Sequence, residues 1–203
     1  IEDPNETELM SLELPFKPDL NFLEDAFEAG HLPKIERTPE YVFMILRGYS
    51  ASEDKAIEVR HISNKIAFFV LKNLVVTIHR TPFSFLQNIP HDLALADELV
   101  LVIIKELLNT FEPAIQTQAE KMDALEQTIF LKSGNNLSIE QLYFEKAKAR
   151  LSKKILVIMQ GVFSQYNVDE SLRTSLQDIK DTLLAMILRT EEVIDDANAL
   201  MNS

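Results

Sequence analysis

The sequence has no cysteine and only four glycines. Without cysteine, the protein has no disulfide framework, no thiolate zinc site and no cysteine nucleophile. The glycines are scattered along the chain, so they cannot form a glycine-rich loop that binds phosphate. The sequence also lacks the Gly-x-Ser-x-Gly motif that positions the nucleophile of many hydrolases. These absences argue against the commonest classes of enzyme, and we predict that the protein is not an enzyme.

Long hydrophobic runs are also absent. The longest apolar runs extend from Ile66 to Leu71 and from Leu99 to Ile104, whereas a helix that crosses a bilayer needs about 20 apolar residues. The first residues, Ile1 to Pro4, do not form the apolar segment of a signal peptide. Because the chain starts with isoleucine instead of methionine, we expect it to be a piece of a longer protein.

Basic residues are fewer than acidic residues in this chain. The chain has 32 acidic residues against 20 lysines and arginines, which gives a formal net charge of −12. A protein that binds nucleic acid presents a basic surface to phosphates, so this charge argues against nucleic acid as a partner. An acidic chain instead favours cations as ligands. The histidines lack the close pairing that metal sites favour; they are His31, His61, His79 and His91.

Two parts of the chain differ in their turn-forming residues. Seven of the eight prolines precede residue 91, so 1–90 is predicted to be an α/β unit of short elements and 91–203 a region of long helices. The elements predicted for 1–90 are a helix at 19–29 and strands at 41–46, 57–62, 66–71 and 74–79. Lys72 and Asn73 are typical of a tight hairpin turn, because asparagine tolerates positive φ. The predicted fold class is α+β, a small mixed sheet with flanking helices followed by a long antiparallel helical stalk.

The region 91–203 is predicted to form three antiparallel helices joined by short turns. The first begins near His91 and is kinked or restarted at Pro113, and the second is capped by Ser138. The last, 169–203, contains neither glycine nor proline and is about 50 Å long at about 1.5 Å per residue. Its apolar side chains recur in steps of three and four, as in a coiled coil, with one interruption at Thr190. They are Leu172, Leu176, Ile179, Leu183, Met186, Val193, Ala197 and Leu200.

Acidic residues on the last helix are candidate metal ligands. Asp178 and Asp181 are three positions apart, and Glu192 and Asp195 repeat the same heptad phases, so each pair lies on one face of the helix. Sites built only from carboxylate oxygens suit Mg²⁺ and Ca²⁺. The alternative interpretation is an ordinary solvated flank beside a coiled-coil seam.

A basic cluster lies on the preceding helix. One interpretation is a solvated face that pairs with Glu120, Asp123 and Glu126 on a neighbouring helix, and the other is a surface that contacts an anionic membrane. The cluster consists of Lys146, Lys148, Arg150, Lys153 and Lys154.

Several segments resemble CorA-type divalent-cation transporters in their order and spacing. They are LNFLEDAFEAGHLPKIERTPEYVFMILRGY from Leu20 to Tyr49 and FFVLKNLVVTIHR from Phe68 to Arg80. The acidic helix LLNTFEPAIQTQAEKMDALEQ, the basic helix LYFEKAKARLSKKI and the final long helix also resemble helices of this family. The resemblance covers nearly the whole chain.

The resemblance implies a cytoplasmic domain that senses divalent cations and gates a Mg²⁺ or Co²⁺ channel at the inner membrane. Family members form homopentamers, and their two membrane helices would follow Ser203. Asp178 falls near a stalk aspartate of the family that binds a regulatory cation between subunits. The family's partner acid follows the last strand, where this chain has no acid at 81–84, so Asp181 and Asp92 are the candidate second ligands. Mg²⁺ is therefore the expected ion. Two alternatives are a relative that moves Zn²⁺ and a soluble coiled-coil scaffold with no pore.

Overall fold

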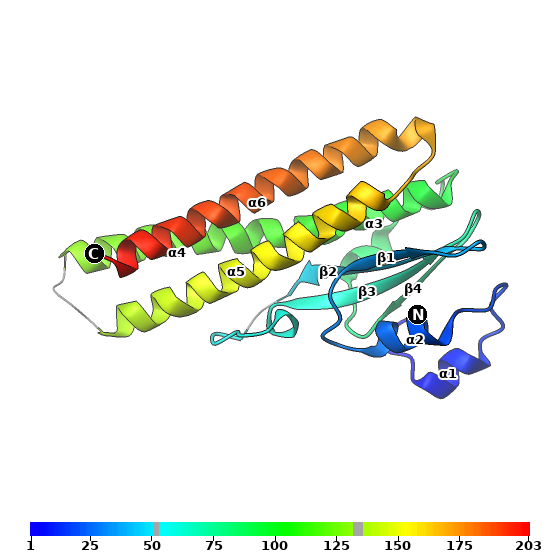
Figure 1. Ribbon diagram of the computed structural model, residues 1–203, viewed down its shortest axis with the longest axis horizontal. Helices are drawn as coiled ribbons and strands as arrows, with labels where there is room; N and C mark the ends of the chain where they lie inside the picture. The colour runs from blue at the N-terminus through cyan, green and yellow to red at the C-terminus, as the bar shows by residue number, and fades with distance from the viewer. Residues whose placement is uncertain (51–52, 132–135) are drawn as a thin grey trace.

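A computed structural model describes residues 1–50, 53–131 and 136–203. Figure 1 shows a sheet with the short helices α1 (Glu6–Ser11) and α2 (Leu20–Phe27) on one face and long helices on the other. The long helices extend well past the sheet, so the molecule is elongated. The α+β architecture with a helical stalk is confirmed.

The sheet has four strands in the order β1-β2-β3-β4, and every neighbouring pair is antiparallel. Its strands are β1 (Lys34–Arg37), β2 (Val42–Tyr49), β3 (Ser63–Val70) and β4 (Val75–His79). The prediction of a mixed sheet is therefore wrong, because each strand returns antiparallel beside its predecessor. In the described residues, parallel pairing is limited to an isolated bridge between Glu2 and His79.

The central strands β2 and β3 are buried on both faces. Met44 and Phe68 pack towards the long helices, whereas Phe43 and Phe69 pack towards α1 and α2. Successive side chains of a strand point to opposite faces, so a strand covered on both sides is apolar throughout. This is why 41–46 and 66–71 are continuous apolar runs.

The segment 57–62 is not the strand that the sequence predicted. Val59–His61 forms a short 3₁₀ helix. The His61 side chain accepts hydrogen bonds at Nδ1 from the backbone N–H groups of Ile57 and Glu58, both at 3.2 Å. These bonds give the backbone an alternative to strand pairing.

The hairpin from β3 to β4 is confirmed, with the Leu71 N–H donating to the Leu74 carbonyl at 2.8 Å. In the described chain, Asp3 is the only non-glycine residue with positive φ. The turn therefore does not use positive φ at Asn73.

Four long helices follow: α3 (Ala96–Asn109), α4 (Phe111–Leu131), α5 (Asn136–Gln165) and α6 (Arg173–Met201). Helix α3 ends at Asn109, and Thr110 separates it from α4. Pro113 lies in the first turn of α4, where its missing N–H costs no helical hydrogen bond. The turn predicted around 133–136 falls mainly outside the described residues. Helix α5 begins at Asn136 instead of being capped by Ser138.

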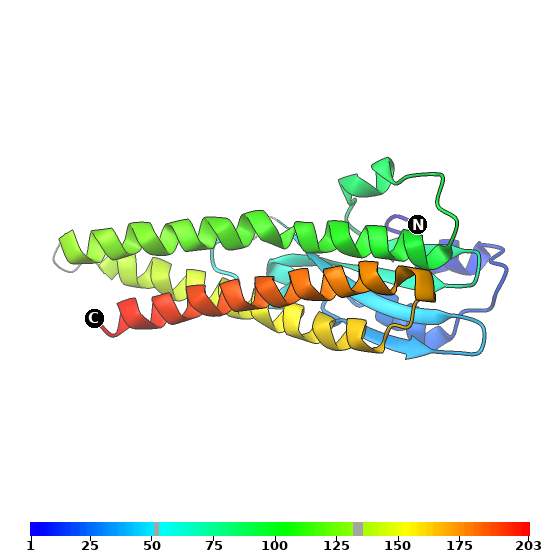
Figure 2. The ribbon, with the colours of Figure 1, turned by 90° about the horizontal axis from the view of Figure 1, so that it is seen from above.

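Helix α6 is one continuous helix, as its periodicity predicted. Figure 2 shows α6 running beside α5, with α3 beside its first half and α4 beside its second half. The Asp169 side chain caps the preceding 3₁₀ turn by accepting a hydrogen bond from the Ser171 N–H at 3.0 Å. Thr190 is completely buried within the apolar seam, and its hydroxyl donates to the Ile187 carbonyl at 2.7 Å. A threonine fits the seam because its own helix satisfies its polar group.

Gly48 and Gly161 offer a matched test of the packing of β2 on α3. A Cβ atom at Gly48 would lie 2.9 Å from Leu107 Cδ2, whereas a Cβ atom at Gly161 in α5 would meet no atom within 4 Å. We expect Gly48→Ala to lower the free energy of unfolding by about 1–3 kcal/mol through overpacking. Gly161→Ala should raise it by about 0.5–1 kcal/mol, because alanine favours a helix. Urea denaturation measures both effects, and equal stability of the two variants would contradict the close packing at Gly48.

Candidate metal sites

Asp178 and Asp181 both lie on the exposed side of α6. Asp178 lines a groove of about 400 Å³ between α3 and α6, opposite Glu98 and Lys105 of α3. The Asp181 carboxylate accepts a hydrogen bond from Gln177 Nε2 at 2.9 Å. Within the described chain, neither aspartate belongs to a group of three close acidic or histidine ligands. A metal site at Asp178 or Asp181 therefore needs ligands from water or from another copy of the chain.

The basic cluster on α5 differs from the solvated face that the sequence predicted. Lys148 is buried, and Lys153 pairs with Glu191 of α6 at 3.2 Å. In the part of the chain that the structure describes, no ion pair joins the cluster to the predicted partners Glu120, Asp123 and Glu126. Those partners were wrong because α5 packs along α6 as well as α4, and α6 carries the nearer acid.

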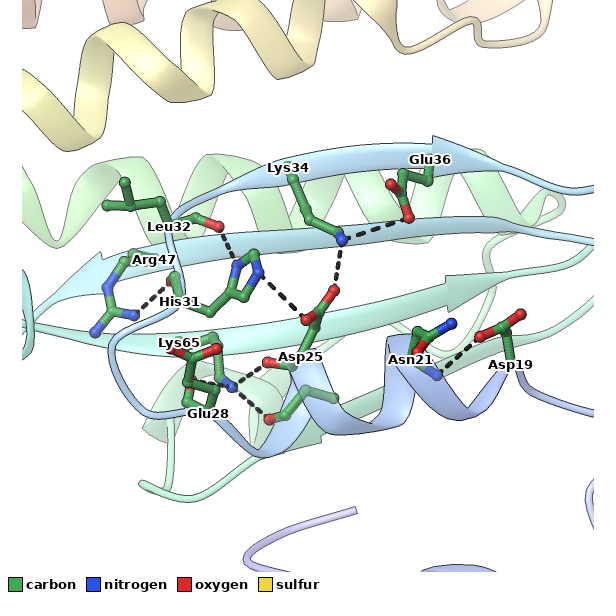
Figure 3. A network of polar contacts seen from close by, with 11 residues as sticks. Asp19, Asn21, Asp25, Glu28, His31, Leu32, Lys34, Glu36, Arg47 and Lys65 are labelled. Carbon is green, nitrogen blue, oxygen red and sulfur yellow. Dashed lines mark hydrogen bonds and ion pairs between the residues drawn. The ribbon is translucent and has the colours of Figure 1, made fainter.

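A second group of metal-ligand side chains was not predicted. Asp25, Glu28 and His31 have ligand atoms that all lie within 4.8 Å of one another. They are the only such group of three among the described residues. Figure 3 shows their arrangement at the end of α2 beside the sheet. Asp25 belongs to α2, Glu28 caps it, and the His31 N–H donates to the Glu28 carbonyl at 3.2 Å. The spacing of three residues between successive members was the available sequence signal.

The contacts of this group favour a nitrogen ligand at His31. Its Nδ1 lies 2.7 Å from the Leu32 carbonyl, which only accepts hydrogen bonds, so Nδ1 carries a proton. Nε2 then faces Asp25 Oδ1 at 3.4 Å. A histidine that donates one ring N–H to a carbonyl and directs the other nitrogen at neighbouring ligand atoms has the orientation found in metal sites. A mixed nitrogen and oxygen donor set suits Zn²⁺ better than Mg²⁺.

Lys34 opposes a metal at this place. Its Nζ contacts Asp25 Oδ2 at 2.5 Å and Glu36 Oε2 at 3.4 Å. Burial lowers the pKa of Lys34, but the bond to Asp25 and the charges of Asp25 and Glu36 outweigh it, and the net pKa is raised. Asp25 is therefore already neutralised by an ammonium group, and a metal would have to displace it.

Two buried cations from the sheet hold the end of α2. Lys65 Nζ donates to the carbonyls of Asp25, Ala26 and Glu28 at 2.5–2.8 Å. The neighbouring Arg47, which pairs with Lys65 across β2 and β3, donates through Nη1 to the carbonyls after α2 at 3.0 Å. Cations suit this end because the last carbonyls of a helix carry partial negative charge. Their signal in the sequence was a charged residue inside each apolar strand.

Burial lowers the pKa of both cations. The pKa of Arg47 falls to about 10. Burial, together with the positive charges of Arg47 and Arg80, lowers the pKa of Lys65 to about 7.

Asp25, Glu28 and His31 are thus positioned by a structural cap. The oxygen-only pair on α6 is the more accessible candidate for a hard divalent cation.

A protein-family model described as "CorA-like Mg2+ transporter protein" matches residues 1–203, the entire chain. No curated protein sequence matches the chain. Among the described residues, none of the helices has both the length and the apolar character needed to cross a membrane.

Solved structures share the fold. The soluble domain of CorA from Methanocaldococcus jannaschii matches with a TM-score of 0.82 and 14% identity, covering 99% of this chain and 84% of that one. The complete CorA magnesium transporter from the same organism matches with a TM-score of 0.83 and 15% identity; 99% of this chain aligns with 66% of that protein. The ZntB cytoplasmic domain from Vibrio parahaemolyticus matches with a TM-score of 0.65 and 12% identity, covering 97% and 80% of the two chains.

The lowered pKa of Lys65 predicts how its contribution to stability depends on pH. Between its folded pKa of about 7 and its unfolded pKa of about 10.4, the unfolded chain binds more protons at this site than the folded chain does. Stability from Lys65 therefore rises with pH in this window. We expect the free energy of unfolding of the wild type, minus that of Lys65→Met, to increase from pH 7 to pH 10.

Chemical denaturation at several pH values measures this difference, and other titrating groups cancel in it. Lys72→Met, which removes an exposed lysine from the hairpin turn, is the matched control and should show no such slope. A flat difference for Lys65→Met would mean that the three carbonyl oxygens keep the ammonium charged throughout.

Proposed function

The chain belongs to the CorA-like Mg²⁺ transporter family, and we propose that it is the cytoplasmic regulatory domain of a divalent-cation channel in the inner membrane. The observation that carries the proposal is the family match over residues 1–203, supported by the fold shared with the CorA soluble domain. The chain spans 66% of the complete CorA transporter that it resembles. We infer that the pore is formed by membrane helices that follow α6.

Mg²⁺ is the ion that we propose for transport, with Co²⁺ and Zn²⁺ as alternatives. The family description names Mg²⁺, and the two CorA structures are more similar to this chain than the ZntB domain is. The likeness to ZntB keeps the zinc alternative open. A role as an enzyme or as a scaffold without a pore has no comparable support, since the family consists of ion transporters.

The regulatory step that we propose acts between copies of the chain. Asp178 and Asp181 are exposed on α6, and Glu98 faces Asp178 across the groove to α3. Bringing such surfaces together in chains of net charge −12 produces repulsion between carboxylates. A divalent cation shared by two copies offsets this repulsion, and its loss favours separation of the copies and opening of the pore.

An outward-facing apolar stripe on α6 supports self-association. Leu184 and Leu188 are 46% and 51% exposed, respectively, and lie one turn apart. They follow Asp181 along the same side of the helix, away from the buried seam. We propose that this side of α6 contacts neighbouring subunits of a homopentamer, with acidic residues at the edge of the apolar contact.

Ion flux through the complete protein tests the proposed function. The protein encoded by the gene that contains this chain is reconstituted in liposomes that enclose a fluorescent Mg²⁺ indicator. We expect it to admit Mg²⁺ down its concentration gradient, and a parallel assay with a Zn²⁺ indicator tests the alternative ion. A folded protein that passes neither ion would falsify the transporter proposal.

The regulatory site is tested on the 203-residue chain itself. We expect Mg²⁺ to raise the thermal midpoint by about 3–6 °C at ten times its dissociation constant, because it binds the folded state. Asp178→Asn should remove most of this increase. Without Mg²⁺ the chain should be monomeric or weakly associated by sedimentation velocity, and Mg²⁺ should strengthen association.

Asp196→Asn is the control, because it removes another exposed carboxylate at a different heptad position, further along the same helix. It should retain the Mg²⁺ response. Equal responses of wild type, Asp178→Asn and Asp196→Asn would remove Asp178 from the proposed site without touching the transport proposal.

A further inference from the structure

A polar pocket of about 460 Å³ lies where the sheet meets the helical stalk. Tyr49 and Asp54 line it from the segment at the end of β2, Gln118 and Lys121 from α4, and the buried Glu145 and Lys148 from α5. These segments come from three distant parts of the chain. The metal sites considered above use none of these residues.

Gln118 is a buried amide with no internal partner. Its side chain is 3% exposed, and neither Nε2 nor Oε1 has a hydrogen-bond partner in the described structure. A buried amide without hydrogen bonds costs free energy, and buried polar groups in native proteins are nearly always paired. Exchanging the amide nitrogen and oxygen does not help, because both atoms lack a partner. Gln118 lines the pocket, so a molecule in the pocket can satisfy it.

The Lys148 side chain is mostly buried, and its charge is weakly compensated within the described chain. It is 5% exposed, and its nearest carboxylate oxygen, Glu145 Oε1, is 3.8 Å away. That oxygen already accepts a hydrogen bond from Lys121 Nζ at 2.8 Å. Two ammonium groups thus compete for one carboxylate oxygen, and Lys148 makes no hydrogen bond in the described part of the chain. The hydrogen-bond donors of the Lys148 ammonium group are therefore available to a molecule in the pocket.

We propose that this pocket binds a small organic molecule through a carboxylate or phosphate group. The anionic group accepts hydrogen bonds from Lys148 Nζ and from the Gln118 amide nitrogen, while Gln118 Oε1 accepts one from a donor on the ligand. A metal ion fits less well, because two lysines of the lining, Lys121 and Lys148, lie beside Glu145 and would repel it. The pocket volume lies in the range of small-molecule sites.

The position of the pocket gives its ligand a regulatory role. The Tyr49 N–H donates to Thr110 Oγ1 at 2.7 Å, so the end of β2 is bonded to the break between α3 and α4. A ligand that also contacts α5 binds only while these three segments are together. It therefore stabilises one arrangement of the sheet relative to the stalk. This inference goes beyond cation sensing and does not depend on which ion is transported.

The purified 203-residue chain is titrated with inorganic phosphate and with succinate, at ionic strength matched by KCl. We expect saturable shifts of the Gln118 side-chain amide resonance in ¹⁵N correlation spectra, assigned by its disappearance in Gln118→Met. Phosphate and succinate distinguish the two anionic groups, since the stronger binder identifies the preferred one. Saturation by neither probe would overturn the proposal.

Lys148→Met should weaken binding about tenfold or more, because a hydrogen bond to a charged group is lost. Lys146→Met is the matched control: it removes the same charge from the same helix, but Lys146 lines a different groove, and binding should be retained. Equal weakening by both variants would show a general effect of charge and would overturn the site.

Gln118→Met keeps the test valid if Lys148→Met fails to fold. Removing the unpaired amide should raise the thermal midpoint without ligand, while binding, measured by calorimetry, should weaken. A variant that is stabilised but binds the probe as well as the wild type would show that Gln118 has no part in a site and would overturn the proposal.

Discussion

The lengthwise packing of α6 against α4 and α5 is the constraint on which the rest of the stalk depends. Leu176, Ile179 and Leu183 join the core that also contains the sheet, whereas Val193 and Ala197 join a separate core further along. Burying this one seam fixes the rotation of α6 about its axis. Asp178, Asp181 and the two exposed leucines then face outwards by geometric necessity. The proposed metal site and the proposed subunit contact both follow from that rotation.

Buried polar groups play two different parts in this fold. Arg47 and Lys65 are costly to bury, but backbone carbonyls satisfy them, and together they hold α2 against the sheet. Gln118 lacks such partners within the described chain, and Lys148 has only a carboxylate oxygen at 3.8 Å that already accepts a hydrogen bond from Lys121. A satisfied polar group is explained by the fold itself, whereas an unsatisfied one calls for something that the fold does not supply. The ligand pocket was inferred from this contrast.

Local patterns in the sequence predicted the long final helix, the β3–β4 hairpin and the family to which the chain belongs. Each depends on neighbours within a few residues or on the order of segments. The strand at 57–62 was wrong because a histidine side chain bonds to nearby backbone, which alternation of polarity does not register. The partners of the basic cluster were wrong because ion pairs depend on which helices meet. Asp178 and Asp181 remain a prediction, placed on an exposed face and awaiting their test.

By itself, the sequence determined the periodicities and the charge balance, because apolar spacing acts over one or two turns of chain. Only the tertiary structure decided which distant residues meet. It brought Asp25, Glu28 and His31 beside Lys65, and Gln118 beside Lys148. The register of β2 on β3 and the packing of α5 against both α4 and α6 bring these distant residues together. These contacts between distant segments bury the largest continuous apolar surface, and no single segment of the sequence specifies them.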